Sequence, residues 1–309
     1  MRLLIVHSRA PEYAALIEKS LPNLEIIAAR SGREVPASMK GIDVILAWRF
    51  PKELLKRATH LRWLVSTGAG VDHLLIPSLP EEVVITKAPP IFSRPITEYV
   101  MGYILYLTLN IEEVVSNKRR KVWAAPPRAA LSGKVMGVLG MGTIGTEVAK
   151  AANVFGMRTW GVRRTPRPSP DAEKVFGKNE LESFLPHVDF LVVTLPLTEE
   201  TQNLMGAREL SLLKPECWVV NVARGRIFDE ESLVSALREA RLGGYISDVF
   251  GVEPLPETSP LWELPNVIIT PHYGAITPPE EFTPYFVDNV RRYLRGEPLR
   301  YKVDRKKGY

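Results

Sequence analysis

The chain has 309 residues, of which 45% are hydrophobic and 24% are charged, the balance of a soluble globular enzyme with about two domains. No apolar run reaches the ~20 residues of a transmembrane helix, and the N-terminal segment turns polar after Val6, too early for a signal peptide. The single Cys217 excludes an intrachain disulfide and a cysteine-built metal site. We therefore expect a cytoplasmic protein that binds neither a membrane nor a metal.

The net charge of +5 and the isoelectric point of about 9.2 raise the question of a nucleic-acid partner. The densest basic runs cover residues 117–121 and 305–309, and no helix-turn-helix, zinc or RNA-binding signature accompanies them. The first run ends a predicted helix, where cations complement the helix dipole. We expect no nucleic-acid partner, because a modest positive field also suits an enzyme with small anionic ligands.

Short apolar runs alternate with helical segments along the chain, a rhythm that is typical of parallel sheets covered by helices on both faces. In the first third, an amphipathic helix is expected over residues 11–20, between the first two strands. The strands expected there cover residues 2–6, 24–29, 43–48, 62–67 and 83–88.

A mostly apolar stretch from Ser93 to Lys121 predicts one long helix, with Pro95 near its start, where proline is tolerated. The strand rhythm then restarts over residues 134–140, 159–164, 189–195, 217–223, 243–249 and 266–272. After His272 a loop leads into a last helix, whose apolar positions are Phe282, Tyr285, Phe286, Val290 and Tyr293. A chain that returns to its first unit in this way would leave the second unit as an insertion.

A glycine loop joins the first strand of the second series to a helix. Gly140, Gly142 and Gly145 form G-x-G-x-x-G between that strand and the helix, which is the dinucleotide-binding fingerprint in its proper context. The first helical residues, Thr143 and Ile144, would present free N–H groups to a pyrophosphate. The alternative is an ordinary glycine turn of an α/β protein. We predict that the loop binds a dinucleotide.

Two arginines stand where such proteins usually carry an acidic residue for the adenosine ribose. Arg163 lies eighteen positions after Gly145 (163 − 145), Arg164 follows it, and no Asp or Glu occurs between Thr159 and Pro170. Guanidinium groups cannot accept a hydrogen bond from a 2′-hydroxyl, but they bind a 2′-phosphate well. The sequence therefore favours NADP(H), with NAD(H) possible, over the alternative of two solvated arginines on a turn.

Six further segments carry a family resemblance. They are "STGAGVDHL" (66–74), "ITEYVMGYIL" (96–105), "TLPLTEETQNLM" (194–205), "NVARGRIFDEESLVSAL" (221–237), "SDVFGVEPLP" (247–256) and "NVIITPHYGAIT" (266–277). With the glycine loop, they closely resemble the D-isomer-specific 2-hydroxyacid dehydrogenases over nearly the whole chain. The arginine pair and "LAWRFP" (46–51) are most similar to the glyoxylate/hydroxypyruvate reductases of that family.

The resemblance implies an α/β fold of two doubly wound parallel-sheet domains. A Rossmann dinucleotide-binding domain, residues 96–274, would be inserted into a flavodoxin-like substrate-binding domain formed by residues 1–95 and 275–309. It also implies a homodimer joined through the dinucleotide-binding domains.

For the chemistry, the resemblance implies that Arg224 binds the substrate, that His272 is the general acid/base and that Glu253 is its partner carboxylate. Reducing a 2-oxo acid needs these residue types, because an arginine grips a carboxylate as a planar fork and a histidine supplies the proton. A neighbouring carboxylate would orient the ring and favour the imidazolium. The alternatives are a surface arginine, a turn glutamate before Pro254 and a structural histidine.

The remaining expected contacts also come from the resemblance. Asp248 would lie near the nicotinamide carboxamide, Ala223 would contact the cofactor, and backbone groups of Ala69 and Gly70 would hold the substrate carboxylate. Ser247 departs from the family, which usually has a hydrophobic residue there, and we expect it to alter the packing under Asp248.

The expected reaction is hydride transfer from NADPH to a small 2-oxo acid such as glyoxylate or hydroxypyruvate, giving the D-2-hydroxy acid. Two other functions stay open: NAD-linked oxidation of a D-2-hydroxy acid such as 3-phosphoglycerate, and a non-catalytic regulator that senses dinucleotides. Trp48, Arg49, Trp123 and Tyr273 could shape substrate selectivity, or could be core or subunit contacts.

Overall fold

The computed structural model describes residues 1–309 and divides them into two compact units. Unit 1 comprises residues 1–92 and 276–309, and unit 2 comprises residues 93–275. The chain therefore crosses between the units twice, and unit 2 is an insertion in unit 1.

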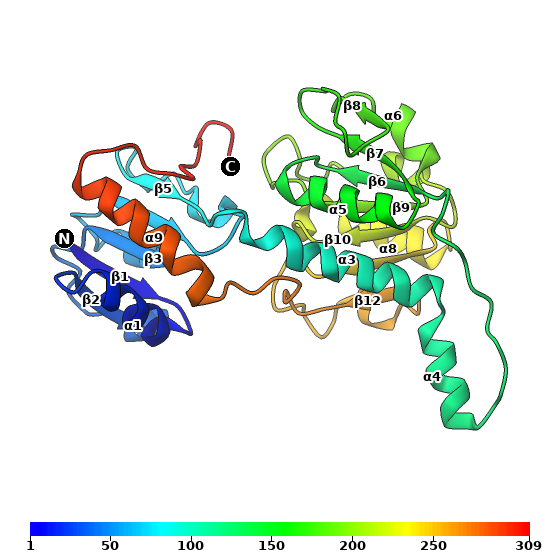
Figure 1. The fold of residues 1–309 in the computed structure, drawn as a ribbon, viewed down its shortest axis with the longest axis horizontal. Coiled ribbons are helices and arrows are strands. Elements are labelled where there is room, and N and C mark those ends of the chain that lie inside the picture. The colour runs from blue at the N-terminus through cyan, green and yellow to red at the C-terminus, as the bar shows by residue number, and fades with distance from the viewer. The chain divides into compact units, whose positions relative to one another are not determined.

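Unit 1 is built on a five-stranded parallel sheet in the order β2-β1-β3-β4-β5 (Figure 1). Its strands are β1 (Arg2–Val6), β2 (Glu25–Ala29), β3 (Val44–Ala47), β4 (Trp63–Ser66) and β5 (Val84–Thr86). The central strands β3 and β4 are buried along their whole length, which is why they read as unbroken apolar runs. This strand order is that of flavodoxin-like folds.

The helices of unit 1 are α1 (Ala10–Ser20), α2 (Lys52–Leu55) and α9 (Pro279–Leu294), and α9 packs against α1. Phe282 of α9 meets Tyr13 of α1 edge to face, with ring centroids 5.8 Å apart, and Phe286 stacks on Trp63 at 5.6 Å. The apolar face predicted for this helix includes Tyr285, which instead is 39% exposed.

The C-terminal segment completes the edge of this sheet. Val303 is buried in the core, its N–H donates to the Ile85 carbonyl at 2.9 Å, and Lys302 forms an antiparallel bridge with Thr86 of β5. Residues from both ends of the chain thus share one hydrophobic core.

Unit 2 contains a seven-stranded parallel sheet in the order β12-β11-β10-β9-β6-β7-β8. Its strands are β6 (Val135–Leu139), β7 (Arg158–Val162), β8 (Lys174–Phe176), β9 (Phe190–Val193), β10 (Trp218–Asn221), β11 (Gly244–Ser247) and β12 (Val267–Ile269). Counted from β6, this is the strand order of Rossmann folds. The short strand β8 is absent from the strands that we predicted.

The helices of unit 2 are α3 (Ser93–Thr108), α4 (Ile111–Arg120), α5 (Thr143–Val154), α6 (Leu181–Phe184), α7 (Ala207–Ser211) and α8 (Glu230–Arg238). The single long helix predicted over residues 93–121 is wrong, because the chain breaks at Asn110, whose φ of 50° is left-handed. Asparagine tolerates this conformation better than most residues do. Helix α4 then extends away from the rest of unit 2 (Figure 1).

The predicted fold class is confirmed: both units are doubly wound α/β structures with parallel sheets. None of the helices combines the length and the apolar character needed to span a membrane.

Candidate active site

The glycine loop after β6 has two positions that accept only glycine. Gly140 has a φ of 115°, and a Cβ there would lie 2.9 Å from the backbone nitrogen of Leu195. A Cβ on Gly145 would lie 2.3 Å from the Gly140 carbonyl oxygen, so this glycine lets α5 pack closely on the loop. At both positions, the requirement for glycine comes from the protein's own backbone conformation and neighbouring atoms, without a ligand.

Gly142 differs, because a Cβ there would meet no atom of the chain within 4 Å. It is the residue before α5, and no side chain caps that helix, so the N–H groups of its first residues, Thr143 and Ile144 among them, point outward. Open space above uncapped N–H groups fits the pyrophosphate of a dinucleotide. The loop also lies at the switch point of the sheet, where β6 has β7 on one side and β9 on the other.

Arg163 and Arg164 directly follow β7, at the same edge of the sheet as the glycine loop. Nη2 of Arg164 lies 3.4 Å from Oε2 of Glu200, and Nζ of Lys178 lies 3.3 Å from the same oxygen. The sequence did not single out Lys178, which follows the unpredicted strand β8. We name Arg163, Arg164, Lys178 and Glu200 the ribose-end cluster; its cations fit a 2′-phosphate.

His272 and Glu253 are hydrogen-bonded to each other in unit 2. Nδ1 of His272 lies 2.9 Å from Oε2 of Glu253, and the side chains are 26% and 17% exposed. Oε1 of Glu253 accepts the Phe250 N–H at 3.0 Å, which fixes the carboxylate. Because Nδ1 faces the carboxylate, Nε2 is the ring nitrogen that we expect to exchange a proton with a substrate.

Arg224 follows β10 and precedes the short 3₁₀ helix Gly225–Ile227. Its Nη1 donates to the Ala223 carbonyl at 2.7 Å, and Asn221 bonds both to the Ala223 N–H and to the Arg224 carbonyl. Arg224, Asp248 and His272 thus come after β10, β11 and β12, three neighbouring parallel strands. The carboxyl ends of such strands are where open α/β sheets place ligands.

Asp248 is 2% exposed and fully engaged within unit 2. Its Oδ1 accepts the Thr270 hydroxyl at 2.6 Å and the Tyr273 N–H at 2.9 Å, and its Oδ2 accepts the Gly274 N–H at 2.9 Å. These bonds fasten the segment that carries His272.

The departure at Ser247 is accommodated by hydrogen bonds. Its buried hydroxyl donates to the Val249 carbonyl at 2.7 Å and lies 3.0 Å from the Tyr245 hydroxyl, which also accepts from Asn221. A polar group in this position therefore has partners, and Asp248 keeps its own contacts.

The other expected residues lie elsewhere. Ala69 and Gly70 are in unit 1, in the turn between β4 and the 3₁₀ helix Asp72–Leu74, and both are accessible. Trp48 and Arg49 follow β3, also in unit 1, with the guanidinium 4.8 Å from the ring centroid. Trp123 is fully exposed beyond the end of α4. Each unit thus carries part of the expected set.

Comparison with known proteins defines the class. Residues 101–274 match the family model "D-isomer specific 2-hydroxyacid dehydrogenase, NAD binding domain". The chain is also 31% identical to a glyoxylate/hydroxypyruvate reductase A of Klebsiella pneumoniae (strain 342), with 100% of both chains covered. The chain therefore belongs to the D-isomer specific 2-hydroxyacid dehydrogenases, and the predicted resemblance is confirmed.

Solved structures agree. A D-isomer specific 2-hydroxyacid dehydrogenase family protein from Aeromonas salmonicida superimposes with a TM-score of 0.92 at 34% identity, over 98% of this chain and 99% of that one. An NADPH-dependent glyoxylate/hydroxypyruvate reductase from Sinorhizobium meliloti, solved with NADP and sulfate, gives a TM-score of 0.90 at 27% identity, over 100% and 99%.

Proposed function

We propose that the chain is an NADPH-dependent reductase of small 2-oxo acids such as glyoxylate or hydroxypyruvate. Unit 2 would bind the dinucleotide. The observation that carries the proposal is the His272–Glu253 pair. Its two atoms lie 2.9 Å apart, His272 follows the last strand of a Rossmann sheet, and two arginines follow the second strand of that sheet. The family and its NADP-bound relative support it.

The residues fit the cofactor at both of its ends. Gly142 and the N-terminus of α5 would receive the pyrophosphate, and Arg163 and Arg164 would pair with the 2′-phosphate. When bound, NADPH supplies a hydride from C4 of its nicotinamide to the carbonyl carbon of the substrate. The remaining work, which is to orient the acid and to protonate the carbonyl oxygen, falls to side chains of this protein.

His272 would donate the proton from Nε2 to the carbonyl oxygen as the hydride arrives at the carbon, so that the oxo group becomes a hydroxyl group. Glu253 would stabilise the protonated ring and fix its orientation through Nδ1. Arg224 would bind the substrate carboxylate and polarise the carbonyl, assisted by the backbone of Ala69 and Gly70.

The decisive experiment follows NADPH absorbance against a panel of 2-oxo acids, with NADH in parallel and His272→Gln as the matched inactive control. We expect turnover of glyoxylate or hydroxypyruvate that prefers NADPH and depends on His272. Absence of turnover with every acid in the panel, or turnover that survives in the control, would overturn the proposal.

We also propose that the protein acts as a cytoplasmic homodimer joined through unit 2. The support is the exposed apolar surface of α4 and the segment after it, where Val114, Val115, Val122 and Trp123 are 40% to 104% exposed. Size-exclusion chromatography coupled to light scattering measures the mass of the protein in solution. We expect about twice the mass of one chain, which is 34.7 kDa. A monomer mass at micromolar concentration would contradict the dimer.

A further inference from the structure

The segment from Thr270 to Gly274 is held on both sides of His272. Before the histidine, the Thr270 N–H donates to the Ser247 carbonyl at 2.9 Å. After it, the N–H groups of Tyr273 and Gly274 both donate to the Asp248 carboxylate at 2.9 Å. The Asp248 carboxylate therefore holds the backbone that follows His272.

The Asp248 carboxylate is reached in turn from helix α3. The Tyr99 hydroxyl lies 2.7 Å from Oγ1 of Thr270, and that oxygen lies 2.6 Å from Oδ1 of Asp248. A carboxylate only accepts hydrogen bonds, so the single proton of the Thr270 hydroxyl points to Asp248 and Tyr99 donates to Thr270. The two hydrogen bonds thus run in one direction, from Tyr99 through Thr270 to Asp248, and hydrogen bonds in such a series strengthen one another when they are buried.

Burial favours this direction. Tyr99 is 8% exposed, Thr270 4% and Asp248 2%. Burial raises the pKa of the Tyr99 hydroxyl well above its usual value, so the hydroxyl keeps its proton and remains a donor.

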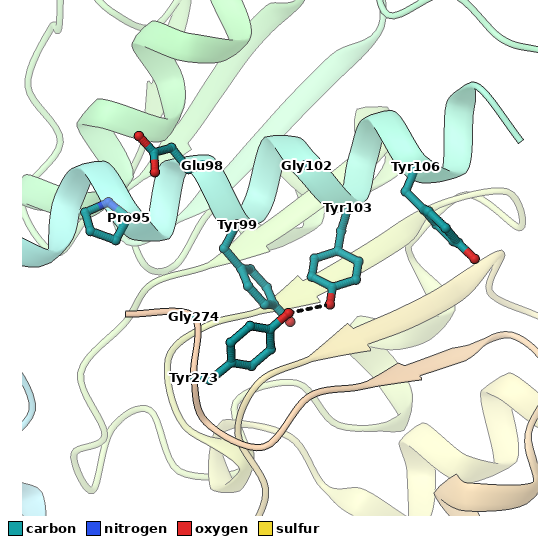
Figure 2. A pocket seen from close by; sticks show the side chains of 8 residues that line it. All are labelled: Pro95, Glu98, Tyr99, Gly102, Tyr103, Tyr106, Tyr273 and Gly274. Carbon is teal, nitrogen blue, oxygen red and sulfur yellow. Dashed lines mark hydrogen bonds between the residues drawn. The ribbon is translucent and has the colours of Figure 1, made fainter. Parts of the chain in front are cut away.

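Helix α3 makes a second contact with the same segment. Figure 2 shows Tyr99 and Tyr103 pointing from α3 towards Tyr273 and Gly274, beside a pocket of about 430 Å³, and the Tyr103 and Tyr273 hydroxyls are 2.9 Å apart. A Cβ on Gly274 would lie 2.9 Å from Oδ2 of Asp248 and 3.2 Å from the Tyr99 ring, so the backbone approaches both closely.

Helix α3 also packs against α5, the helix that begins at the glycine loop. One rigid helix therefore packs on the element that would receive the cofactor and also anchors the segment that carries His272. Such an arrangement fixes the acid relative to the dinucleotide, and a shift of about 1 Å in such geometry can cost on the order of 100-fold in rate.

We propose that Tyr99 and Thr270 are positioning residues of this reductase, which act through Asp248 to hold His272 in register with the bound cofactor. The inference rests on the proposed function. The buried hydroxyl groups of Tyr99, on α3, and of Thr270, directly after β12, would thus affect the chemical step, although neither touches the reacting atoms.

The test compares isosteric changes that remove one hydroxyl group. Thr270→Val should lower kcat on the order of tenfold to 100-fold and leave the KM for NADPH within about twofold, since the loss leaves a buried carboxylate short of a donor. Thr270→Ser keeps the hydroxyl and should restore most of the turnover. Tyr99→Phe should lower kcat on the order of fivefold to tenfold. The matched control is Tyr106→Phe, whose hydroxyl on the same helix bonds to Glu112 instead and which should retain full activity.

A further readout separates positioning from general destabilisation. Amide hydrogen exchange over residues 270–276 should speed up in Thr270→Val and Tyr99→Phe at unchanged exchange in β6.

Variants with unchanged kcat and unchanged exchange, or with only a lower melting temperature, would overturn the positioning role. A wild-type protein that reduces no 2-oxo acid would refute the proposed function instead. The exchange measurement still tests the Tyr99–Thr270–Asp248 chain in that case, since it needs no turnover.

Discussion

His272 adopts a backbone conformation that most side chains avoid. Its φ is 54°, in the left-handed region, and its N–H donates to the Thr270 carbonyl at 3.1 Å. Such a conformation persists only where the surroundings over-determine it, and it concentrates at functional sites. Here the determinants are the Glu253 contact at the ring and the Asp248 contacts at the two following N–H groups.

Replacing His272 by Gln should lower kcat by at least ~100-fold, because general acid catalysis typically contributes 10²–10⁴-fold. The affinity for NADPH should stay within a few-fold, since the glycine loop and the arginine pair are untouched. Steady-state kinetics with glyoxylate and fluorescence titration of NADPH measure the two quantities. Near wild-type turnover would remove His272 from the mechanism.

Arg224→Lys should not behave as a conservative change. Lysine keeps the charge but loses the planar fork that grips a carboxylate in two places. We expect a raised KM for the 2-oxo acid together with a lower kcat, while NADPH binding stays unchanged. Normal kinetics of this variant would mean that the substrate carboxylate is held elsewhere, for which Arg49 of unit 1 is the first residue to test.

At the scale of elements, we propose that the residues after β7 set the preference between NADPH and NADH. Arg164 and Lys178 share the carboxylate of Glu200, which occupies the position of a counterion between them. All three side chains are roughly half exposed, so their contacts are weakened by solvent and by salt. The ribose-end cluster therefore contains both the cations that would bind a 2′-phosphate and a carboxylate that would compete with the phosphate for them.

Removing both Arg163 and Arg164 as alanines should raise the KM for NADPH on the order of 10- to 100-fold and leave that for NADH almost unchanged. Glu200→Gln should do the opposite and lower the KM for NADPH about twofold to fivefold, since the competing carboxylate is gone. Both effects should shrink in high salt. Equal losses for the two cofactors in the double variant would show that the arginines are a solvated turn.

Asp189 joins β6 and β9 at the end of the sheet opposite to the site. Its Oδ2 accepts the Val135 N–H at 2.7 Å, and its Oδ1 lies 2.9 Å from Nζ of Lys214. Burial alone would raise the pKa of Asp189, but the Val135 N–H and the Lys214 ammonium outweigh burial and hold that pKa below its ordinary value of 3.8.

A depressed pKa means that Asp189 stabilises the fold above pH ~4 and that this contribution is lost as pH falls through the folded-state pKa. Asp189→Asn should therefore lower the free energy of unfolding by about 1–2 kcal/mol at pH 7. The difference from the wild type should shrink as the pH falls from 7 to below ~4, where Asp189 becomes protonated in the folded state too. Denaturant unfolding at several pH values measures it, and a constant difference across that range would contradict the assignment.

Across the whole molecule, the sequence predicted both sheets because buried parallel strands are unbroken apolar runs. It missed β8, whose three residues are partly exposed and follow a proline-rich turn. It also missed the break at Asn110, because the apolar pattern continues past that residue and a single left-handed turn has little signature.

The residues of the candidate site also divide into those that the sequence predicted and those that it missed. The glycine loop and the residues after β10, β11 and β12 could be identified because local motifs mark them. The contact of Tyr99 with Thr270 could not, since the two residues are 171 positions apart and only the packing of α3 on unit 2 brings them together. The pairing of Lys178 with Glu200 depends on the unpredicted strand β8 in the same way.

The insertion of unit 2 into unit 1 has a consequence for synthesis on the ribosome, which releases the chain from its N-terminus. Residues 1–92 emerge first, yet their sheet lacks Val303 against β5, and α1 lacks its partner α9, until the last segment is made. Unit 2 is contiguous and can finish folding in the meantime. The part of the protein that is translated first is thus completed last, and while it waits it exposes the apolar faces of α1 and β4 on which Phe282 and Phe286 will pack, the surface that a chaperone would recognise in the nascent chain.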